Sequence, residues 1–253
     1  MLSILKNRKT IRKYQQRNVD DKLINELLEA AFRASTTGNM QLYSVVITRD
    51  EKQKERLSPT HFNQPTFKNA PVSLTFCADF NRFNKWCEQR NATPGYDNFL
   101  SFLTAAIDAL LVAQTFCIAA ESKGLGICYL GTATYNAKKI AEILELPKFV
   151  VPVTTIALGY PDENPAQTDR LPVEALIHSE TYKDYSKEAI ERIYAYKESL
   201  AENKKYIAEN NKETLAQVFT DVRYKKADNE FFSGTFLNFL EEQGFLDVKL
   251  KMF

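Results

Sequence analysis

The longest apolar stretch of this chain runs from Phe99 to Gly124, FLSFLTAAIDALLVAQTFCIAAESKG. A helix of this length would nearly span a lipid bilayer. Polar residues interrupt it at Ser101, Thr104, Asp108, Gln114 and Thr115. A charged side chain is costly at the centre of a bilayer, and the chain has no second apolar stretch of comparable length. We therefore predict a helix over 99–123 that ends at Gly124 and is buried all round, in a protein core or a subunit interface, with no membrane contact.

Short strands and an amphipathic helix are predicted on either side of this stretch. Runs of β-branched and aromatic residues predict strands at 43–48, 71–78, 126–130 and 153–161. Residues 20–34 predict an amphipathic helix with Asp20 or Asp21 near its N-cap. The apolar stripe of this helix consists of Leu23, Ile24, Leu27, Leu28 and Ala31.

The character of the sequence changes from about Gln167 onward. SKEAIERIYAYKESLAENKKYIAEN is charged with a helical pattern, and GTFLNFLEEQGF predicts a last short helix that Gly244 can cap. This tail has too few strand signals to form a second core. We predict a core over residues 1–165 and a helical C-terminal extension over 166–253.

The charge balance limits the choice of partner. The chain carries 33 basic and 32 acidic residues, a net charge of +1, whereas a duplex-binding protein normally has an overall basic bias. Four scattered cysteines without CxxC spacing and two distant histidines predict no metal site and a reducing cytoplasm. The first residues, MLSILKNRKT, contain no apolar segment of the kind found in signal peptides.

Basic residues nevertheless gather in NRKTIRKY (7–14) near the N-terminus. Such a cluster is typical of a solvated tail, a nucleic-acid contact or a phosphate site, and the balanced charge elsewhere disfavours the second. Arg170 lies in the Pro-flanked loop NPAQTDRLP (164–172). This arginine is either solvated or aimed at a phosphate, because the guanidinium fork matches phosphate oxygens.

Two polar segments are candidates for lining a pocket. ASTTGNMQLYS (34–44) is either a plain turn or a set of donors and acceptors suited to a planar heterocycle. In YLGTATYNAKKIAEILELP (129–147), Gly131 allows a ligand to approach the backbone, and Asn136 is a candidate N-cap. No Walker loop, GxGxxG, GxSxG or HExxH motif occurs.

The order and spacing of several segments resemble the nitroreductase family of FMN-dependent enzymes, in particular its oxygen-insensitive NAD(P)H nitroreductase and flavin reductase P branch. The segments are RKTIRKY (8–14), RASTTGNMQ (33–41), FCADFNR (76–82), AAESKGLGICYLG (119–131), LPKFVVPVTTIALGYPDENP (146–165) and RLPVEALIHSETY (170–182). The resemblance covers nearly the whole chain. It implies an α+β nitroreductase-type fold, in which helices flank a central, mostly antiparallel sheet and the helical extension packs on the core and the partner subunit.

The resemblance also implies a set of FMN-binding residues. Arg8, Lys9, Thr10 and Arg170 correspond to the phosphate site, and Arg12 to the contact with the ribityl or pyrimidine end. Thr36, Thr37, Asn39 and Gln41 correspond to the loop that lines the flavin ring, and Gln64 to a side chain near its pyrimidine edge. Tyr129, Leu130, Gly131 and Thr132 correspond to the segment that passes backbone amides along the ring.

The function implied is hydride transfer from NAD(P)H through flavin N5 to nitroaromatic, quinone or flavin acceptors, by a ping-pong mechanism in a homodimer. No side chain is expected to act as a catalytic nucleophile, because the cofactor carries the chemistry. Three alternatives remain open: a relative that reduces enones, a flavin-binding protein with little turnover, and a nucleic-acid-binding module. The colour of the purified protein would separate the flavin-binding hypotheses from the nucleic-acid-binding one, and bleaching of that colour by NAD(P)H would separate an enzyme from a passive flavin-binding protein.

Two departures from the family pattern concern charge. A second basic residue is usual two positions before the loop arginine, where this chain has Thr168. The basic loop that reads the 2′-phosphate of NADPH has only scattered counterparts: Lys204, Lys205, Lys212, Arg223, Lys225 and Lys226.

Overall fold

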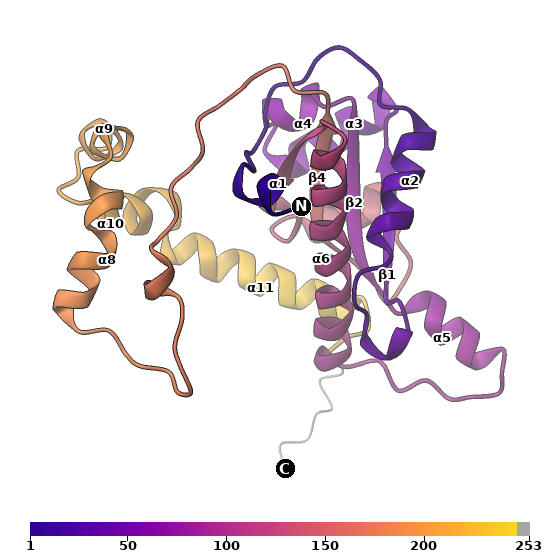
Figure 1. The fold of residues 1–253 in the computed structure, drawn as a ribbon. Coiled ribbons are helices and arrows are strands. Elements are labelled where there is room, and N and C mark those ends of the chain that lie inside the picture. The colour runs from indigo at the N-terminus through magenta and orange to yellow at the C-terminus, as the bar shows by residue number, and fades with distance from the viewer. Residues whose placement is uncertain (247–253) are drawn as a thin grey trace. The chain divides into compact units, whose positions relative to one another are not determined.

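A four-stranded antiparallel sheet with strand order β1-β2-β4-β3 lies at the centre of the fold (Figure 1). The strands are β1 (Tyr43–Thr48), β2 (Val72–Asp79), β3 (Gly126–Leu130) and β4 (Val150–Gly159). All four predicted strands are therefore confirmed. β4 begins earlier than predicted because Val150 and Val151 pair with Asp79 and Ala78 of β2.

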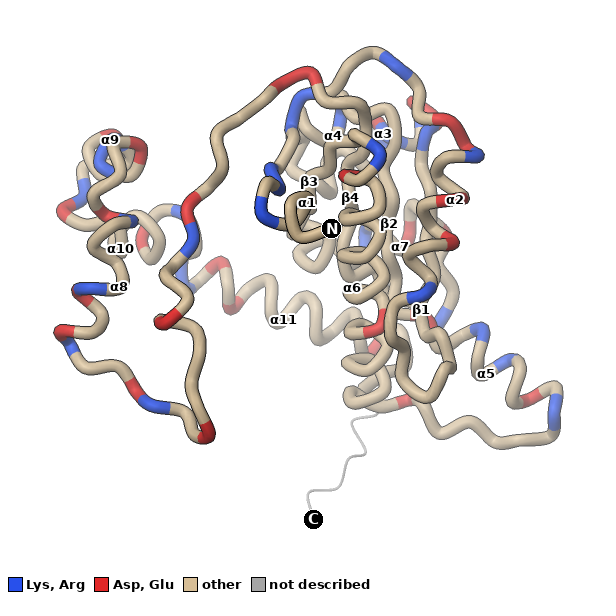
Figure 2. Tube along the Cα trace, viewed as in Figure 1, with Lys and Arg blue, Asp and Glu red and all other residues tan. Residues whose placement is uncertain are grey.

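The computed structural model describes residues 1–246, so the end of the predicted extension, residues 247–253, lies outside the described part. The chain divides into two compact units. The first contains residues 1–167 and the segment from Ser233 onward, and the second contains Thr168–Phe232. In both units basic and acidic residues are interspersed along the chain (Figure 2).

Apolar side chains cover both faces of the sheet in the first unit. Alternate residues of β2 (Val72, Leu74, Phe76 and Ala78) join the larger core with α2 (Asp21–Ala31) and α6 (Phe99–Ser122). The smaller core on the other face contains Cys128, Leu130 and Ala157 with residues of three short helices. These are α3 (Glu51–Leu57), α4 (Pro65–Asn69) and α7 (Ala137–Ile143). The predicted α+β sheet flanked by helices is confirmed.

The remaining elements of the first unit are short. They are α1 (Leu2–Lys6), α5 (Asn81–Glu88), and the 3₁₀ turns η1 (Thr37–Asn39), η2 (Ser58–His61) and η3 (Gly131–Ala133). The predicted cap of α2 is present, since the Asp20 side chain accepts a hydrogen bond from the amide of Lys22 at 2.8 Å.

The long apolar helix α6 is buried on only one side in the single chain. Its outer side exposes Leu100, Leu103, Ile107 and Leu110, spaced three and four residues apart, and Ile107 is 49% exposed. Within the described residues it is also the one helix long and apolar enough to cross a membrane. The inner side of the helix thus lies in the core, as predicted, whereas its outer row is exposed in the single chain, so the predicted burial on every face stays a prediction.

The second unit is helical, as its charged pattern predicts. It contains η4 (Val173–Ala175), α8 (Lys187–Ser199), α9 (Ala201–Glu209), α10 (Leu215–Val218) and the π-helical turn η5 (Phe219–Arg223). Helix α11 (Lys226–Glu242) begins in this unit and ends in the first. The last helix thus starts earlier than the sequence pattern indicated.

Candidate functional site

The basic segment Arg8–Tyr14 lies along β3 and the chain that follows β4. The amide of Ile11 donates to the carbonyl of Ile127 at 3.0 Å, and the amide of Gln15 donates to Tyr160 at 2.9 Å. A Cβ on Gly126 would lie 2.7 Å from the Ile11 side chain, so the glycine allows this close approach. The segment is therefore part of the folded structure and not a solvated tail.

Acidic and amide side chains fix the backbone of this segment. One carboxylate oxygen of Glu163 accepts from the amides of Arg12 and Lys13, the latter at 3.0 Å. The Lys9 ammonium donates to Asn164 Oδ1 at 2.8 Å. Arg12 itself is exposed, and its guanidinium has no hydrogen-bond or ion-pair partner among residues 1–246. Thr10 is half-buried.

Arg8 differs from its neighbours because it meets a carboxylate from α6. Its Nε lies 3.2 Å from Glu121 Oε1, with side chains 23% and 11% exposed, respectively. The two groups form an ion pair by distance but not a hydrogen bond by direction, since Arg8 Nε and both Glu121 oxygens have no hydrogen-bond partner in the described chain.

Asp108, which the sequence presented only as an interruption of α6, holds the polar loop 36–42. The carboxylate is 1% exposed and accepts the Thr36 hydroxyl, the Thr37 amide at 3.0 Å and the Thr37 hydroxyl at 3.2 Å. The amide of Leu42 is a weaker donor at 3.4 Å. The hydroxyls of Thr36 and Thr37 are thus directed to Asp108.

Thr37, Gly38, Asn39 and Gln41 are the exposed members of this loop. Asn39 and Gln41 both have φ of 55°, in the left-handed region that costs non-glycine residues energy. The Gln41 carbonyl accepts a hydrogen bond from Arg82, whose guanidinium also donates to Tyr43 O at 3.1 Å. The loop conformation is therefore fixed from both sides.

A buried histidine supports the turn that follows β3. His61 Nδ1 lies 2.8 Å from Thr132 Oγ1, and the imidazole is fully buried against Phe67, with ring centroids 4.4 Å apart. Burial lowers the pKa of His61 to about 4. Sequence reasoning missed this residue, because a single histidine in a loop carries no signal of its own.

The other residues of this turn are placed differently. A Cβ on Gly131 would meet nothing within 4 Å, whereas Leu130 is 2% exposed and packs in the smaller core. Tyr129 is half-buried, and burial raises its pKa. Asn136 is the N-cap residue of α7, as predicted, but its side chain donates to Thr60 O at 2.8 Å and makes no hydrogen bond to the helix.

Gln64 stands at the start of α4, close to this turn. It is half-buried, and η2 just before it contacts η3. Its side-chain amide has no hydrogen-bond partner within residues 1–246.

Arg170 belongs to the second unit and is exposed. Its guanidinium donates to Thr168 Oγ1 and to Asp169 O, each at 2.8 Å. The Asp169 carboxylate is paired with Lys197 at 2.9 Å. Several candidate co-substrate cations of this unit are also partnered: Lys205 with Glu209, Lys212 with Asp221, and Lys226 with Glu230.

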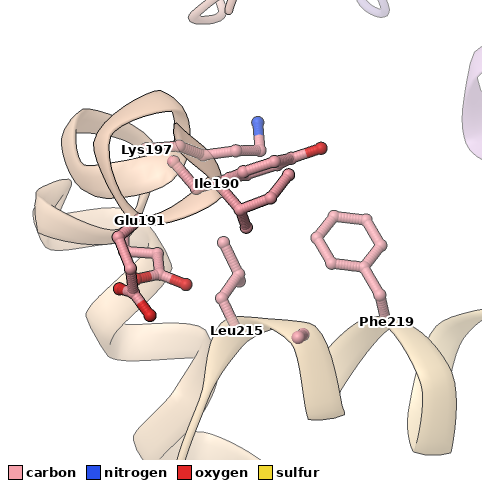
Figure 3. A pocket seen from close by; sticks show the side chains of 8 residues that line it. Ile190, Glu191, Lys197, Leu215 and Phe219 are labelled. Carbon is pink, nitrogen blue, oxygen red and sulfur yellow. The ribbon is translucent and has the colours of Figure 1, made fainter. Parts of the chain in front are cut away.

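The second unit also contains an apolar cavity of about 240 Å³ between α8 and α10 (Figure 3). Ile190, Leu215 and Phe219 line it. None of the predicted site residues lies there. Among the described residues, no group of His, Cys, Asp and Glu side chains is arranged to hold a metal ion.

The predicted site residues of the first unit fall into two groups on one chain. β3 carries the basic segment near its start and the Tyr129–Thr132 turn at its end. The loop 36–42 is held by Asp108, which lies about 20 Å along α6 from Glu121 at 1.5 Å per residue. The structure therefore brings the basic segment and the turn together on one strand, and places the loop towards the other end of α6.

Comparison with known protein families shows the family to which this chain belongs. The nitroreductase family matches residues 5–160, well over half of the chain. The chain belongs to the nitroreductase family.

Individual relatives agree with this family. The FMN reductase (NAD(P)H) of Bacillus subtilis strain 168 is 35% identical over 221 residues, covering 85% of this chain and 86% of that protein. A protein from Bacteroides fragilis NCTC 9343 with a known crystal structure is 64% identical, with a TM-score of 0.96 over 97% of this chain and 100% of that one. The NfrA1 nitroreductase of B. subtilis is 28% identical, with a TM-score of 0.84 over 96% and 98%.

These findings bear out several predictions made from the sequence. The family and the fold are confirmed. The names of the relatives also agree with the predicted class of enzyme, an oxidoreductase that uses FMN and NAD(P)H.

Proposed function

We propose that this protein is an FMN-dependent oxidoreductase that takes hydride from NAD(P)H and reduces nitroaromatic, quinone or flavin acceptors by a ping-pong mechanism in the cytoplasm. The observation that carries the proposal is the basic segment fixed on β3: Lys9, Arg12 and Lys13 have no carboxylate partner among residues 1–246, and Arg8 is paired only through its Nε. Relatives named as FMN reductases support the choice of cofactor and of reductant.

The donor set of this segment fits a terminal phosphate. Arg8, Lys9 and Thr10 offer guanidinium, ammonium and hydroxyl donors, which are the groups that bind phosphate oxygens. The exposed guanidinium of Arg12 is free of partners in the described chain. Gly131 has open space where a side chain would be, so a flat ring can approach its backbone.

FMN, when bound, supplies the hydride chemistry at N5. The chain's own residues would bind and orient it: Arg8, Lys9 and Thr10 would hold the phosphate. Arg12 and Gln64 donate to the pyrimidine end, where hydrogen-bond donors stabilise negative charge. Asn39, Gln41 and the backbone of the Tyr129–Thr132 turn line the ring.

The purified protein is expected to be yellow and to release FMN, not FAD. The basic segment offers one phosphate site, and no dinucleotide fingerprint provides for an adenosine half. Acid release followed by chromatography identifies the flavin, and anaerobic NADH or NADPH should bleach the colour, which an acceptor then restores. A colourless protein, or FAD as the main flavin, would refute the proposed cofactor; a yellow protein that neither reductant bleaches would be a flavin-binding protein with little turnover.

We also propose a homodimer that buries the outer row of α6. Leu100, Leu103, Ile107 and Leu110 are exposed in the single chain. Apolar residues with this heptad-like spacing typically pack against another helix. The loop 36–42 and the basic segment lie too far apart along α6 to meet one small cofactor easily on a single chain. A second subunit would supply the missing half of each site.

The double variant Leu103→Glu/Ile107→Glu is therefore expected to be a monomer with much less bound FMN. Light scattering should give twice 29.0 kDa for the wild type and 29.0 kDa for the variant. Trp86→Glu is the matched control, because Trp86 is an apolar residue of α5 that is 54% exposed away from this row. A monomeric wild type that retains FMN would contradict the proposal.

A further inference from the structure

A carboxylate at position 121 is unfavourable for the stability of the folded protein, which indicates that Glu121 has a functional role. It lies in the last turn of α6, where the negative end of the helix dipole disfavours a carboxylate. Its side chain is 11% exposed, and neither carboxylate oxygen has a hydrogen-bond partner in the described chain. Burial raises the pKa of Glu121, and Arg8 opposes this shift. The residue thus lowers stability in two ways without a hydrogen bond to offset them.

The group that Glu121 faces is Arg8 of the basic segment, and the contact is made through Nε at 3.2 Å. The terminal amino groups of Arg8 donate no hydrogen bond within residues 1–246. The other titratable neighbours are Cys117, Cys128 and Tyr129, and burial raises the pKa of each, so they stay neutral near pH 7. Of these four titratable side chains, only Glu121 carries a negative charge that attracts the Arg8 guanidinium.

We propose that Glu121 is a positioning residue that holds the Arg8 guanidinium by its Nε side and leaves the terminal amino groups for the phosphate of FMN. An arginine side chain has many rotamers, and fixing it in advance lowers the entropy lost when an anion binds. The cost of burying Glu121 is then balanced by a prepared phosphate site, in keeping with the tendency of local rules to fail at functional positions. This role rests on the proposed FMN-binding function.

The test is a double-mutant cycle on flavin affinity in the full-length protein. Flavin-free wild type, Glu121→Gln, Arg8→Ala and the combined variant are titrated with FMN and with riboflavin, which lacks the phosphate, at fixed protein concentration and pH 8. We expect Arg8→Ala to weaken FMN binding roughly ten- to a hundredfold. Glu121→Gln keeps the side-chain volume and should weaken it about three- to tenfold, with no further loss in the Arg8→Ala background.

Riboflavin distinguishes positioning from a general structural effect. Its affinity should be the same in the wild type and in Glu121→Gln, because only the phosphate uses Arg8. Glu26→Gln is the matched control: Glu26 is paired with Lys123 at 2.7 Å on the surface, and its loss should leave both flavins unaffected.

Three outcomes would overturn the inference. Equal weakening for FMN and riboflavin would show a structural role, and a full effect of Glu121→Gln without Arg8 would show that it acts elsewhere. Tighter FMN binding by Glu121→Gln would show that the carboxylate only competes with the phosphate. Wild-type protein that binds no FMN at all would instead refute the proposed function.

Discussion

Replacing Asp108 with alanine is expected to lower the free energy of unfolding by about 3 kcal/mol or more, since each buried donor left without an acceptor costs roughly 1–3 kcal/mol. The carboxylate is 1% exposed and accepts from Thr36, Thr37 and Leu42. Removing it leaves those donors without their acceptor. Urea unfolding at fixed protein and flavin concentrations measures the difference.

Thr115→Ala is the matched control for this experiment. Thr115 also lies on α6, but its hydroxyl only donates back to the Leu111 carbonyl at 2.8 Å, so the change should stay within about 0.5 kcal/mol. Asp108→Ala should also weaken FMN and riboflavin equally, because the loop it holds is proposed to line the ring and not the phosphate. Wild-type stability in Asp108→Ala would show that the loop keeps its conformation without the carboxylate.

Asp108 also marks the limit of what the sequence could show. The apolar residues around it predicted the helix correctly, but Asp108 itself was interpreted only as a polar residue that interrupts the apolar stretch. Its partner Thr36 lies 72 positions away in the chain, and His61 and Thr132 lie 71 apart. Pairings of this kind depend on the fold, and one sequence contains no periodicity that reveals them.

Sequence patterns that depend only on local chemistry predicted the structure correctly. The β-branched runs became strands because alternate residues of each face a core, and Asp20 caps α2 because its side chain reaches the free amide of Lys22. The sequence of α6 could not show which of its sides lies in the core of the single chain, because a protein core and a subunit interface both require apolar residues. Asn136 is the N-cap residue of α7, but the sequence could not show that its side chain donates to the carbonyl of Thr60, 76 positions away.

Acid is expected to destabilise the protein through His61. Burial lowers the pKa of His61 to about 4 from the ordinary value of 6.5, so the unfolded chain binds a proton that the folded protein excludes. Stability should therefore be constant, as far as this group is concerned, above pH 6.5 and fall as the pH drops from 6.5 towards 4, by about 3 kcal/mol in all at 1.36 kcal/mol per pKa unit.

The difference between wild type and His61→Gln isolates this effect, because carboxylates titrate in both proteins and glutamine cannot take up a proton. Urea unfolding from pH 4 to pH 8 should show a wild-type advantage at pH 8 that shrinks as the pH falls. His178→Gln, a change at the chain's other histidine in the second unit, should leave that shrinking advantage in place. Parallel profiles for wild type and His61→Gln would mean that His61 is protonated in the folded protein without cost, so that water or a rearranged Thr132 reaches its ring.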